Sequence, residues 1–218
     1  LVDADPQANA TGSLGVDKNT LTRSLYDVLI GSEAPATLIM VTTHKGLDLL
    51  PAAPALAGAE IEMVSMGGRE VRLRQALATV AARYDYVLID TPPSLGLLTL
   101  NALTAADGVI IPVQCEYLPL EGLSQLLQTI ELVRQNLNPE LSVRGLVMTM
   151  YDSRTNLARQ VVEEVRGHFP GIIFRSIIPR SIRLGEAPSY GEPIISYSPE
   201  SSGGRAYAAL CQELLLEG

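Results

Sequence analysis

Short apolar runs alternate along the chain with longer stretches in which apolar residues recur every three or four positions. The short, strand-like runs lie at 46–50, 86–89, 108–113, 143–150 and 172–178, and those at 86, 108 and 143 are apolar almost without interruption. Runs at 86, 108 and 143 are typical of parallel strands that are covered by helices on both faces. The pattern therefore predicts the strands of a buried sheet.

The longer stretches predict amphipathic helices between these strands. In Pro119–Leu137 and Thr155–Phe169 the apolar residues form a single stripe with helical spacing. Arg69–Arg83 and Arg205–Leu216 read as further helices, and the second of them closes the chain. Repeated strand–helix–strand units predict the α/β class, with a doubly wound, mainly parallel sheet flanked by helices.

The organisation expected for these elements is one domain over residues 1–218. The chain has 218 residues, 47% of them hydrophobic, which is enough to bury a sizeable core. The Pro- and Ala-rich segment Pro51–Gly58 reads as a loop that leads into a helix. Cys115 and Cys211 are far apart and have no metal or redox spacing, so reduced thiols of a cytosolic protein are expected.

Charge is distributed unevenly along the chain. The net charge is −8, which argues against a generally basic nucleic-acid binder. Residues 1–140 hold 8 Lys and Arg against 16 Asp and Glu, whereas residues 141–218 hold 8 Arg, no Lys and 8 Asp and Glu. Arginine clusters in the second part can still meet phosphate, because charges more than about 10 Å apart are largely screened at cellular salt.

Carboxylates follow two of the apolar runs directly. Asp3 and Asp5 end the first run, and Asp90 ends the run at 86–89. Ligands of open α/β sheets bind beyond the carboxyl ends of the strands, where a single Asp can hold Mg²⁺ through water. A second carboxylate nearby can orient the water that attacks in phosphoryl transfer. The alternative is that these side chains only cap helices or turns.

Several motifs in order along the chain resemble those of the ParA/Soj chromosome-partitioning ATPases, which are P-loop NTPases with a deviant Walker A motif. The similarity covers essentially the whole chain, so chance is a poor explanation. The segments that carry it are Asp3–Thr11, Tyr84–Ser94, Pro112–Tyr117, Leu120–Leu123, Thr149–Asn156, Ile178–Leu184, Glu186–Ser189 and Gly191–Tyr197.

The resemblance implies an ATPase that uses ATP and Mg²⁺. ATP-bound dimers of this family bind double-stranded DNA non-specifically, and hydrolysis stimulated by a ParB-type partner releases them. By position, Asp5 matches the residue that positions the catalytic water and contributes to the magnesium shell. Asp90 matches the Walker B aspartate that holds magnesium through water. Asp3 resembles a supporting catalytic carboxylate, and a structural role is an open alternative.

The resemblance also predicts a Gly-rich P-loop before Leu1, with two lysines and a magnesium-binding threonine. Its backbone amides would cradle phosphate. A strand, this loop and a helix need on the order of 30 residues, so we expect the chain to be an N-terminally truncated ParA-type domain. The 218 residues alone are then expected to bind ATP poorly and to be inactive.

Two further sets of site residues come from the resemblance. The adenine base is expected at backbone groups of Pro179, Arg180 and Ser181, with Met150 and Tyr151 nearby. Relatives often carry Asn in place of Ser181, and Gly is common at the position of Ala8. DNA contacts are expected from Arg154 and Arg183, whereas Arg180 and Arg205 are weaker candidates. Arginine suits this task because its planar fork pairs with two phosphate oxygens.

Other functions stay open at this point. A MinD-like membrane-associated positioning ATPase would need a basic amphipathic C-terminal helix, but the segment 211–217 is acidic, so no membrane partner is expected. A redox P-loop enzyme would need cluster-binding cysteines. A nucleotide-free interaction module would use only the dimer surface. The reading favoured by most motifs is a cytoplasmic, nucleoid-associated partitioning ATPase.

Overall fold

The chain forms two compact units in the computed structural model, which describes residues 1–31, 33–116 and 120–217. Unit 1 comprises Leu1–Asp107 and Val133–Leu141, and unit 2 comprises Gly108–Leu132 and Ser142–Gly218. Each unit has its own strands and its own buried apolar cluster. The organisation as one domain stays a prediction.

Strand β1 (Val2–Asp3) lies between two neighbours in unit 1. It pairs in parallel with β4 (Ile89–Asp90), and its other side contacts the segment that ends β3 (Asp48–Leu49). There the Asp3 amide donates to the carbonyl of Leu50 at 3.0 Å. Strand β2 (Met40–Val41) pairs with β3 in antiparallel fashion. The first residues of the chain therefore form an interior strand of this unit.

Helices cover these strands, and their apolar side chains build one core. Leu29, Leu56, Met63 and Leu98 are fully buried in it. The helical segments of unit 1 are α1 (Asn9–Ser13), the π-helical η1 (Asp27–Gly31), the 3-10 helix η2 (Pro35–Thr37), α2 (Leu56–Met63), α3 (Arg72–Leu77), the 3-10 helix η3 (Ala81–Arg83) and α4 (Leu97–Ala105).

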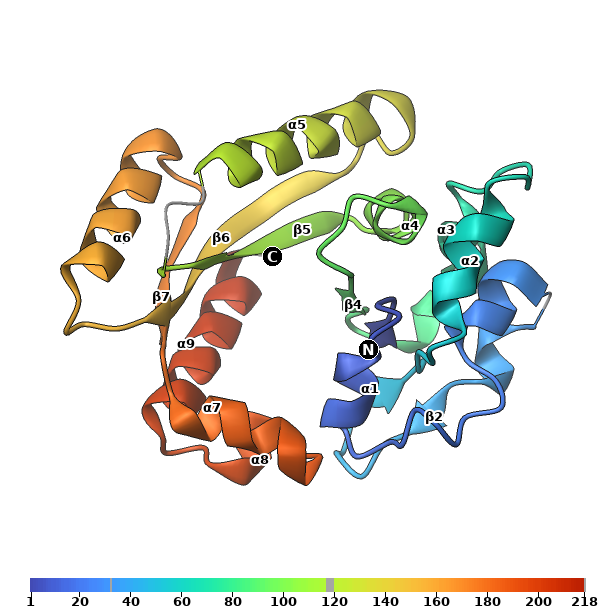
Figure 1. Ribbon diagram of the computed structural model, residues 1–218, viewed down its shortest axis with the longest axis horizontal. Coiled ribbons are helices and arrows are strands. Elements are labelled where there is room, and N and C mark those ends of the chain that lie inside the picture. The colour runs from blue at the N-terminus through green and yellow to red at the C-terminus, as the bar shows by residue number, and fades with distance from the viewer. Residues whose placement is uncertain (32, 117–119, 218) are drawn as a thin grey trace. The chain divides into compact units, whose positions relative to one another are not determined.

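Unit 2 is built on a three-stranded parallel sheet in the order β5–β6–β7 (Figure 1). The strands are β5 (Gly108–Gln114), β6 (Ser142–Tyr151) and β7 (Ile173–Pro179). Helices connect them, as parallel pairing requires. These helical segments are α5 (Leu120–Asn136, which continues into unit 1), α6 (Asn156–His168), α7 (Ile182–Glu186), the 3-10 helix η4 (Ala187–Tyr190), α8 (Ile194–Tyr197) and α9 (Ser202–Glu217).

Helix α9 is fastened to β7 by one carboxylate. Glu213 accepts hydrogen bonds from the amides of Arg175 and Ser176 at 2.6 and 3.0 Å, and from the Ser176 hydroxyl at 2.9 Å. Burial acts to raise the pKa of Glu213, but these hydrogen bonds and the charge of Arg175 outweigh it and lower the pKa. The contacts satisfy backbone donors where the pairing of β6 with β7 is irregular.

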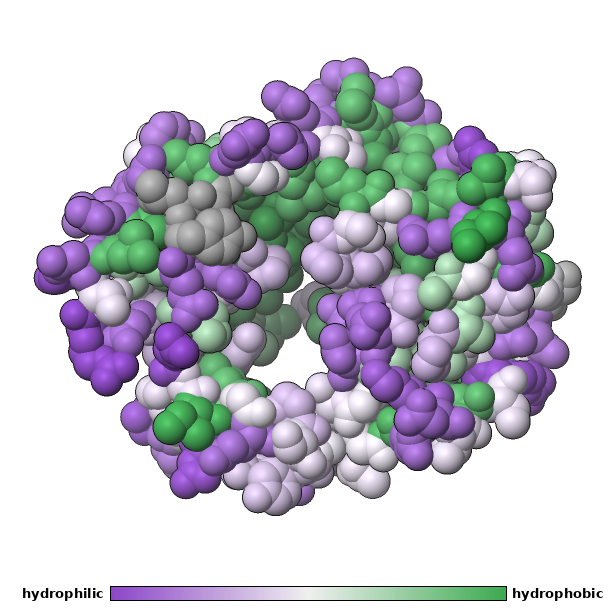
Figure 2. All heavy atoms as spheres, viewed as in Figure 1, coloured by the Kyte–Doolittle hydropathy of each residue, from purple (hydrophilic) through white to green (hydrophobic). Residues whose placement is uncertain are grey.

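The α/β prediction is confirmed, with parallel strands and connecting helices. Helix α6 matches the predicted segment closely, and Thr155 caps it by accepting from the Ala158 amide at 3.3 Å. Its polar face gives the hydrophilic surface seen over α6 in Figure 2. Pro119, the predicted start of the preceding helix, and Tyr117 lie outside the described residues.

Three predicted elements are shorter than expected, and one of them is the run at 46–50, which gives only the two residues of β3. The run at 86–89 gives only β4, which begins at Ile89, and the Tyr86 and Leu88 side chains are exposed. The predicted helix 69–83 is α3 followed by η3, because Thr79 binds the Ala76 carbonyl through both its amide and its hydroxyl. This local pairing competes with the helical hydrogen bonds.

Candidate functional site

The predicted carboxylates of unit 1 meet at the carboxyl ends of two adjacent strands. Asp3 and Asp90 are register partners across β1 and β4, and Asp5 follows two residues after Asp3. The Ala4 amide donates to the Asp90 carbonyl at 2.8 Å, so the pairing continues to the point where the chain turns away. Asp3, Asp5 and Asp90 therefore lie at one edge of the strands of unit 1.

Asp3 is buried and holds the loop after β1 in place. One of its oxygens accepts from the Asp5 amide at 3.2 Å. The other accepts from both the amide and the hydroxyl of Thr11, each at 2.7 Å. The Thr11 hydroxyl in turn accepts from the Ala52 amide at 3.0 Å. Both carboxylate oxygens of Asp3 are therefore used in internal contacts, which favours the structural alternative for this residue over a catalytic one.

Asp5 lies at the start of a tight turn into α1. One carboxylate oxygen accepts from the Gln7 amide at 2.9 Å, which fixes the side chain against its own backbone. Ala8, which begins the helix, has a φ of 52°, a left-handed conformation that favours glycine. Glycine, which the resemblance makes common at this position, adopts this conformation without strain.

The surroundings of Asp90 disfavour its ionised form. Its side chain is open to solvent on one side, but partial burial, followed by the charges of Asp3 and Asp5, raises its pKa. A divalent cation would relieve this repulsion. No group of three or more acidic, His or Cys side chains suited to a metal occurs within residues 1–31, 33–116 and 120–217. Asp90 and Asp5 are the candidate ligands from the sequence, and Mg²⁺ usually takes few ligands from the protein.

Replacing Asp90 by Asn is expected to raise the midpoint of thermal unfolding of the full-length protein at pH 7. The unfolded chain ionises near the ordinary pKa of 3.8, whereas the native pKa is higher. The folded protein thus loses stability as the pH rises through this window, and the variant avoids that loss. The difference in midpoint is expected to vanish below pH 3.8, where both forms carry a neutral side chain.

Calorimetry across pH checks this, with the exposed Asp85→Asn as the matched control that should leave the midpoint unchanged. Added Mg²⁺ should stabilise the parent more than the Asp90 variant. A lower midpoint for Asp90→Asn at pH 7 would contradict the charge repulsion.

In unit 2 the residues predicted around the adenine base lie at the ends of β6 and β7. Met150 has a φ of 54°, an uncommon conformation for a residue other than glycine, and the β6–β7 register shifts beside it. The Arg180 amide donates to the Tyr151 carbonyl at 2.9 Å, and Pro179 pairs with Tyr151. The structure brings together Met150, Tyr151, Pro179, Arg180 and Ser181. Backbone strain of this kind often accompanies binding sites.

Charged side chains lie at the ends of all three strands of unit 2, and one ion pair links the ends of β5 and β7. Arg180, which follows β7, binds Glu116 near the end of β5 at 3.0 Å. Arg154 binds Asp152, which follows β6, through its Nε and Nη2 at 2.9 and 2.7 Å. The side chain and amide of Arg154, with the charge of Arg180, hold the pKa of Asp152 well below its usual range.

Arg183 lies on the first turn of α7. Its guanidinium binds Glu186 at 2.9 Å, and the Tyr197 hydroxyl donates to the same carboxylate at 3.2 Å. The Tyr197 ring stacks on Tyr190 with centroids 5.1 Å apart. The sequence pointed to Arg154 and Arg183 but gave no role to Asp152 or Glu186. The signal that could have found these carboxylates is their spacing, because Asp152 lies two residues from Arg154 and Glu186 lies three residues from Arg183.

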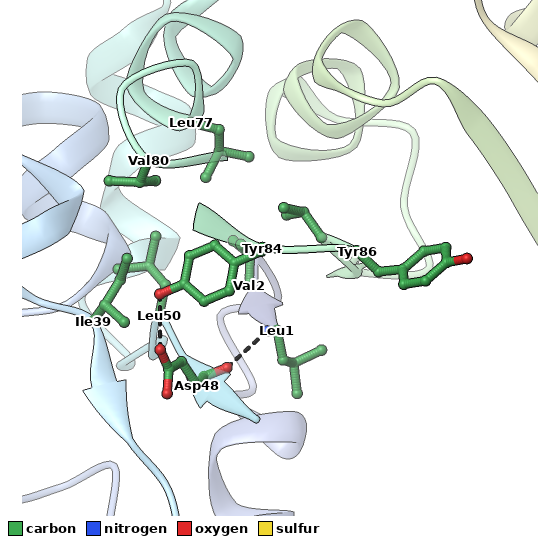
Figure 3. A pocket seen from close by; sticks show the side chains of 10 residues that line it. Leu1, Val2, Ile39, Asp48, Leu50, Leu77, Val80, Tyr84 and Tyr86 are labelled. Carbon is green, nitrogen blue, oxygen red and sulfur yellow. Dashed lines mark hydrogen bonds between the residues drawn. The ribbon is translucent and has the colours of Figure 1, made fainter. Parts of the chain in front are cut away.

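An apolar pocket of unit 1 lies at the opposite, amino ends of its strands (Figure 3). Its polar edge is Asp48, which accepts from the Tyr84 hydroxyl at 2.8 Å and whose backbone carbonyl accepts from the Leu1 amine at 2.8 Å. The remaining lining is mostly aliphatic, from Val2, Ile39, Leu50, Leu77, Val80 and Val87 together with Tyr86. It contains none of the predicted site residues.

The parallel α/β architecture and the strand-end carboxylates define a protein of the nucleotide-binding P-loop NTPase class. A family model described as an AAA domain matches residues 1–143. The chain is 52% identical over 218 residues to the sporulation initiation inhibitor protein Soj of Bacillus subtilis, covering 100% of this chain and 86% of that protein. This chain belongs to the ParA/Soj family of chromosome-partitioning ATPases.

Solved structures share the fold of this chain. The structure of cobyrinic acid a,c-diamide synthase from Mycobacterium smegmatis, with bound ADP and magnesium, has a TM-score of 0.85 and 41% identity, covering 98% of this chain and 80% of that one. The cell division ATPase MinD of Pyrococcus furiosus has a TM-score of 0.77 and 23% identity, covering 100% and 85%, and shows a likeness of fold alone.

Proposed function

We propose that the protein is an ATPase that partitions DNA. In its ATP-bound state it forms a homodimer that binds double-stranded DNA without sequence preference. A ParB-type protein stimulates hydrolysis and thereby releases the DNA. The observation that carries the proposal is the set of three carboxylates at the ends of β1 and β4, in a chain of this family.

Each carboxylate has a distinct proposed task. Asp5, fixed by the Gln7 amide, orients the water that attacks the terminal phosphate of ATP. Asp90 and Asp5 would hold Mg²⁺, which supplies a positive charge beside the phosphates when it is bound. Asp3 keeps the Asp5 loop in register through its contacts with the Asp5 and Thr11 amides.

The ends of β6 and β7 are proposed to hold the adenine base. Backbone groups of Pro179, Arg180 and Ser181 would contact it, with Met150 and Tyr151 beside them. The support is the close pairing of the two strand ends and the left-handed Met150. Ser181 contributes backbone groups in this proposal rather than a specific side-chain contact.

The protein is proposed to act in the cytoplasm, at the nucleoid. In the part of the chain that the structure describes, no helix combines the length and apolar character needed to cross a membrane. Helix α9 has no basic residue in its last turn, which disfavours binding to anionic lipid as a MinD-like protein would need.

Arg183→Glu in the full-length protein is expected to weaken DNA binding at least tenfold while ATP-dependent dimerisation persists. Arg183 is proposed to contact a phosphate, and the substitution replaces that contact with like-charge repulsion. Binding to a duplex of arbitrary sequence, measured with ATP and Mg²⁺ at several salt concentrations, tests this.

Arg166→Glu on α6 is the control of equal charge change, because Arg166 was not assigned to the DNA surface. Dimerisation is followed in parallel by light scattering. Unchanged retention of Arg183→Glu on DNA at low salt would refute the assignment of Arg183.

A further inference from the structure

Both arginines proposed to contact DNA are bound to a carboxylate of their own unit. The Arg154 side chain is 85% exposed, yet two of its nitrogens bind the two oxygens of Asp152. The Arg183 side chain is 58% exposed and binds Glu186. In each case the partner lies two or three residues away, so the contact forms within one local segment.

Such a contact uses the same donors that would bind a phosphate. The planar fork of a guanidinium pairs with a carboxylate and with a phosphate in the same bidentate manner. A phosphate that binds Arg154 through Nε and Nη2 must therefore displace Asp152. At Arg183 the overlap is partial, because Glu186 occupies only Nη1, and a phosphate must displace it where it needs that nitrogen.

We propose that these two carboxylates compete with DNA phosphates for the two guanidinium groups and so lower the affinity of the protein for DNA. The inference rests on the proposed function, because it assumes that the two arginines contact DNA. Asp152 and Glu186 then set the strength of a contact that has to be reversible in a partitioning cycle.

Each carboxylate is also held by other contacts, which keeps it beside its arginine. Asp152 accepts from the Arg154 amide at 3.0 Å, and this turn leads into α6. Glu186 accepts from the Tyr197 hydroxyl, whose ring stacks on Tyr190. Besides the two guanidinium groups, a backbone amide therefore orients Asp152 and a tyrosine hydroxyl orients Glu186.

The experiment uses Asp152→Asn and Glu186→Gln in the full-length protein with ATP and Mg²⁺. An amide keeps an oxygen that can accept from the Arg154 amide or the Tyr197 hydroxyl, but it lacks the charge. Each variant is expected to bind a duplex of arbitrary sequence about three- to fivefold more tightly, the gain available from an exposed ion pair. Unchanged or weaker binding would overturn the proposal and favour a carboxylate that only positions its arginine.

A double-mutant cycle separates competition from a general change of surface charge. In the Arg154→Ala background Asp152→Asn is expected to give no gain, because no guanidinium is left to release. Glu163→Gln, which removes one exposed carboxylate from α6, is the matched control and should change affinity by less than the two test variants. An equal gain in the Arg154→Ala background would overturn the proposal.

Binding to heparin, a second polyanion, tests the competition even if the protein does not bind DNA. If the parent does not bind DNA with ATP and Mg²⁺, the proposed function fails. Elution from immobilised heparin then still tests the competition, since its sulfate groups also bind guanidinium groups. Asp152→Asn should elute at higher salt than the parent, and elution at the same salt would overturn the inference.

Discussion

Asp5→Asn is expected to reduce ATP hydrolysis by about 10²- to 10⁴-fold, the range typical for loss of a positioned acid–base group. ATP-dependent binding to DNA should persist. The separation follows from the proposed task of Asp5, which acts on the attacking water and not on the dimer or the DNA surface. Steady-state hydrolysis and DNA retention, measured on the same full-length preparation, check both halves of this result.

The choice of Asn isolates the charge from the local fold. An Asn oxygen can still accept from the Gln7 amide, so the turn after β1 is retained. The Asp5 and Thr11 amides continue to donate to the Asp3 carboxylate. A loss of hydrolysis with normal stability would then report the missing carboxylate and not a displaced loop.

Asp17→Asn provides the matched control. Asp17 accepts from the Asn19 amide at 2.9 Å, which is the same hydrogen-bond pattern as at Asp5, but it is exposed and does not follow a strand. Its replacement should leave hydrolysis within about twofold of the parent, as for a surface substitution. Hydrolysis by Asp5→Asn at the level of the control would contradict the proposed role of Asp5.

The long helices and the parallel strands could be predicted from the sequence because their apolar patterns are strong. Helices α5, α6 and α9 each carry an extended periodic segment, and β5 and most of β6 are apolar runs. Helix α4 gave no such signal. Six of its nine residues are buried, including Asn101 and two threonines, so apolar and polar side chains do not separate into a stripe.

The candidate site was predictable only in part, because only some of its residues follow a strong apolar run. Asp3, Asp5 and Asp90 follow apolar runs, and the ends of parallel strands meet at one edge of a sheet. The partners of Arg154 and Arg183 depend instead on side-chain conformations, which no periodic pattern records. The left-handed Met150 likewise depends on the shifted β6–β7 register and has no marker in the residue type itself.

Asn101→Leu is expected to lower the free energy of unfolding by about 3 kcal/mol, because it leaves buried backbone groups without partners. Asn101 is fully buried on α4 and accepts from the Leu73 amide at 3.1 Å in the first turn of α3. Its amide nitrogen donates to the Arg69 carbonyl at 2.7 Å. One side chain thus satisfies a donor and an acceptor of a neighbouring segment, which a Leu of similar size cannot do.

Thr104→Val on the same helix is the matched control for this prediction. The buried Thr104 hydroxyl donates at 2.7 Å to the Leu100 carbonyl of its own helix, so its removal should cost less than about 1 kcal/mol. Urea unfolding of the two variants separates the cases through the midpoint, with an unchanged slope showing that the native state remains compact. Equal costs for both variants would mean that the contacts of Asn101 to α3 and Arg69 add nothing to an ordinary buried hydrogen bond. A larger cost at Asn101 would show that its hydrogen bonds stabilise the contact between α3 and α4. Helix α4 lies in the segment between Asp90 and β5, so this contact also stabilises that segment.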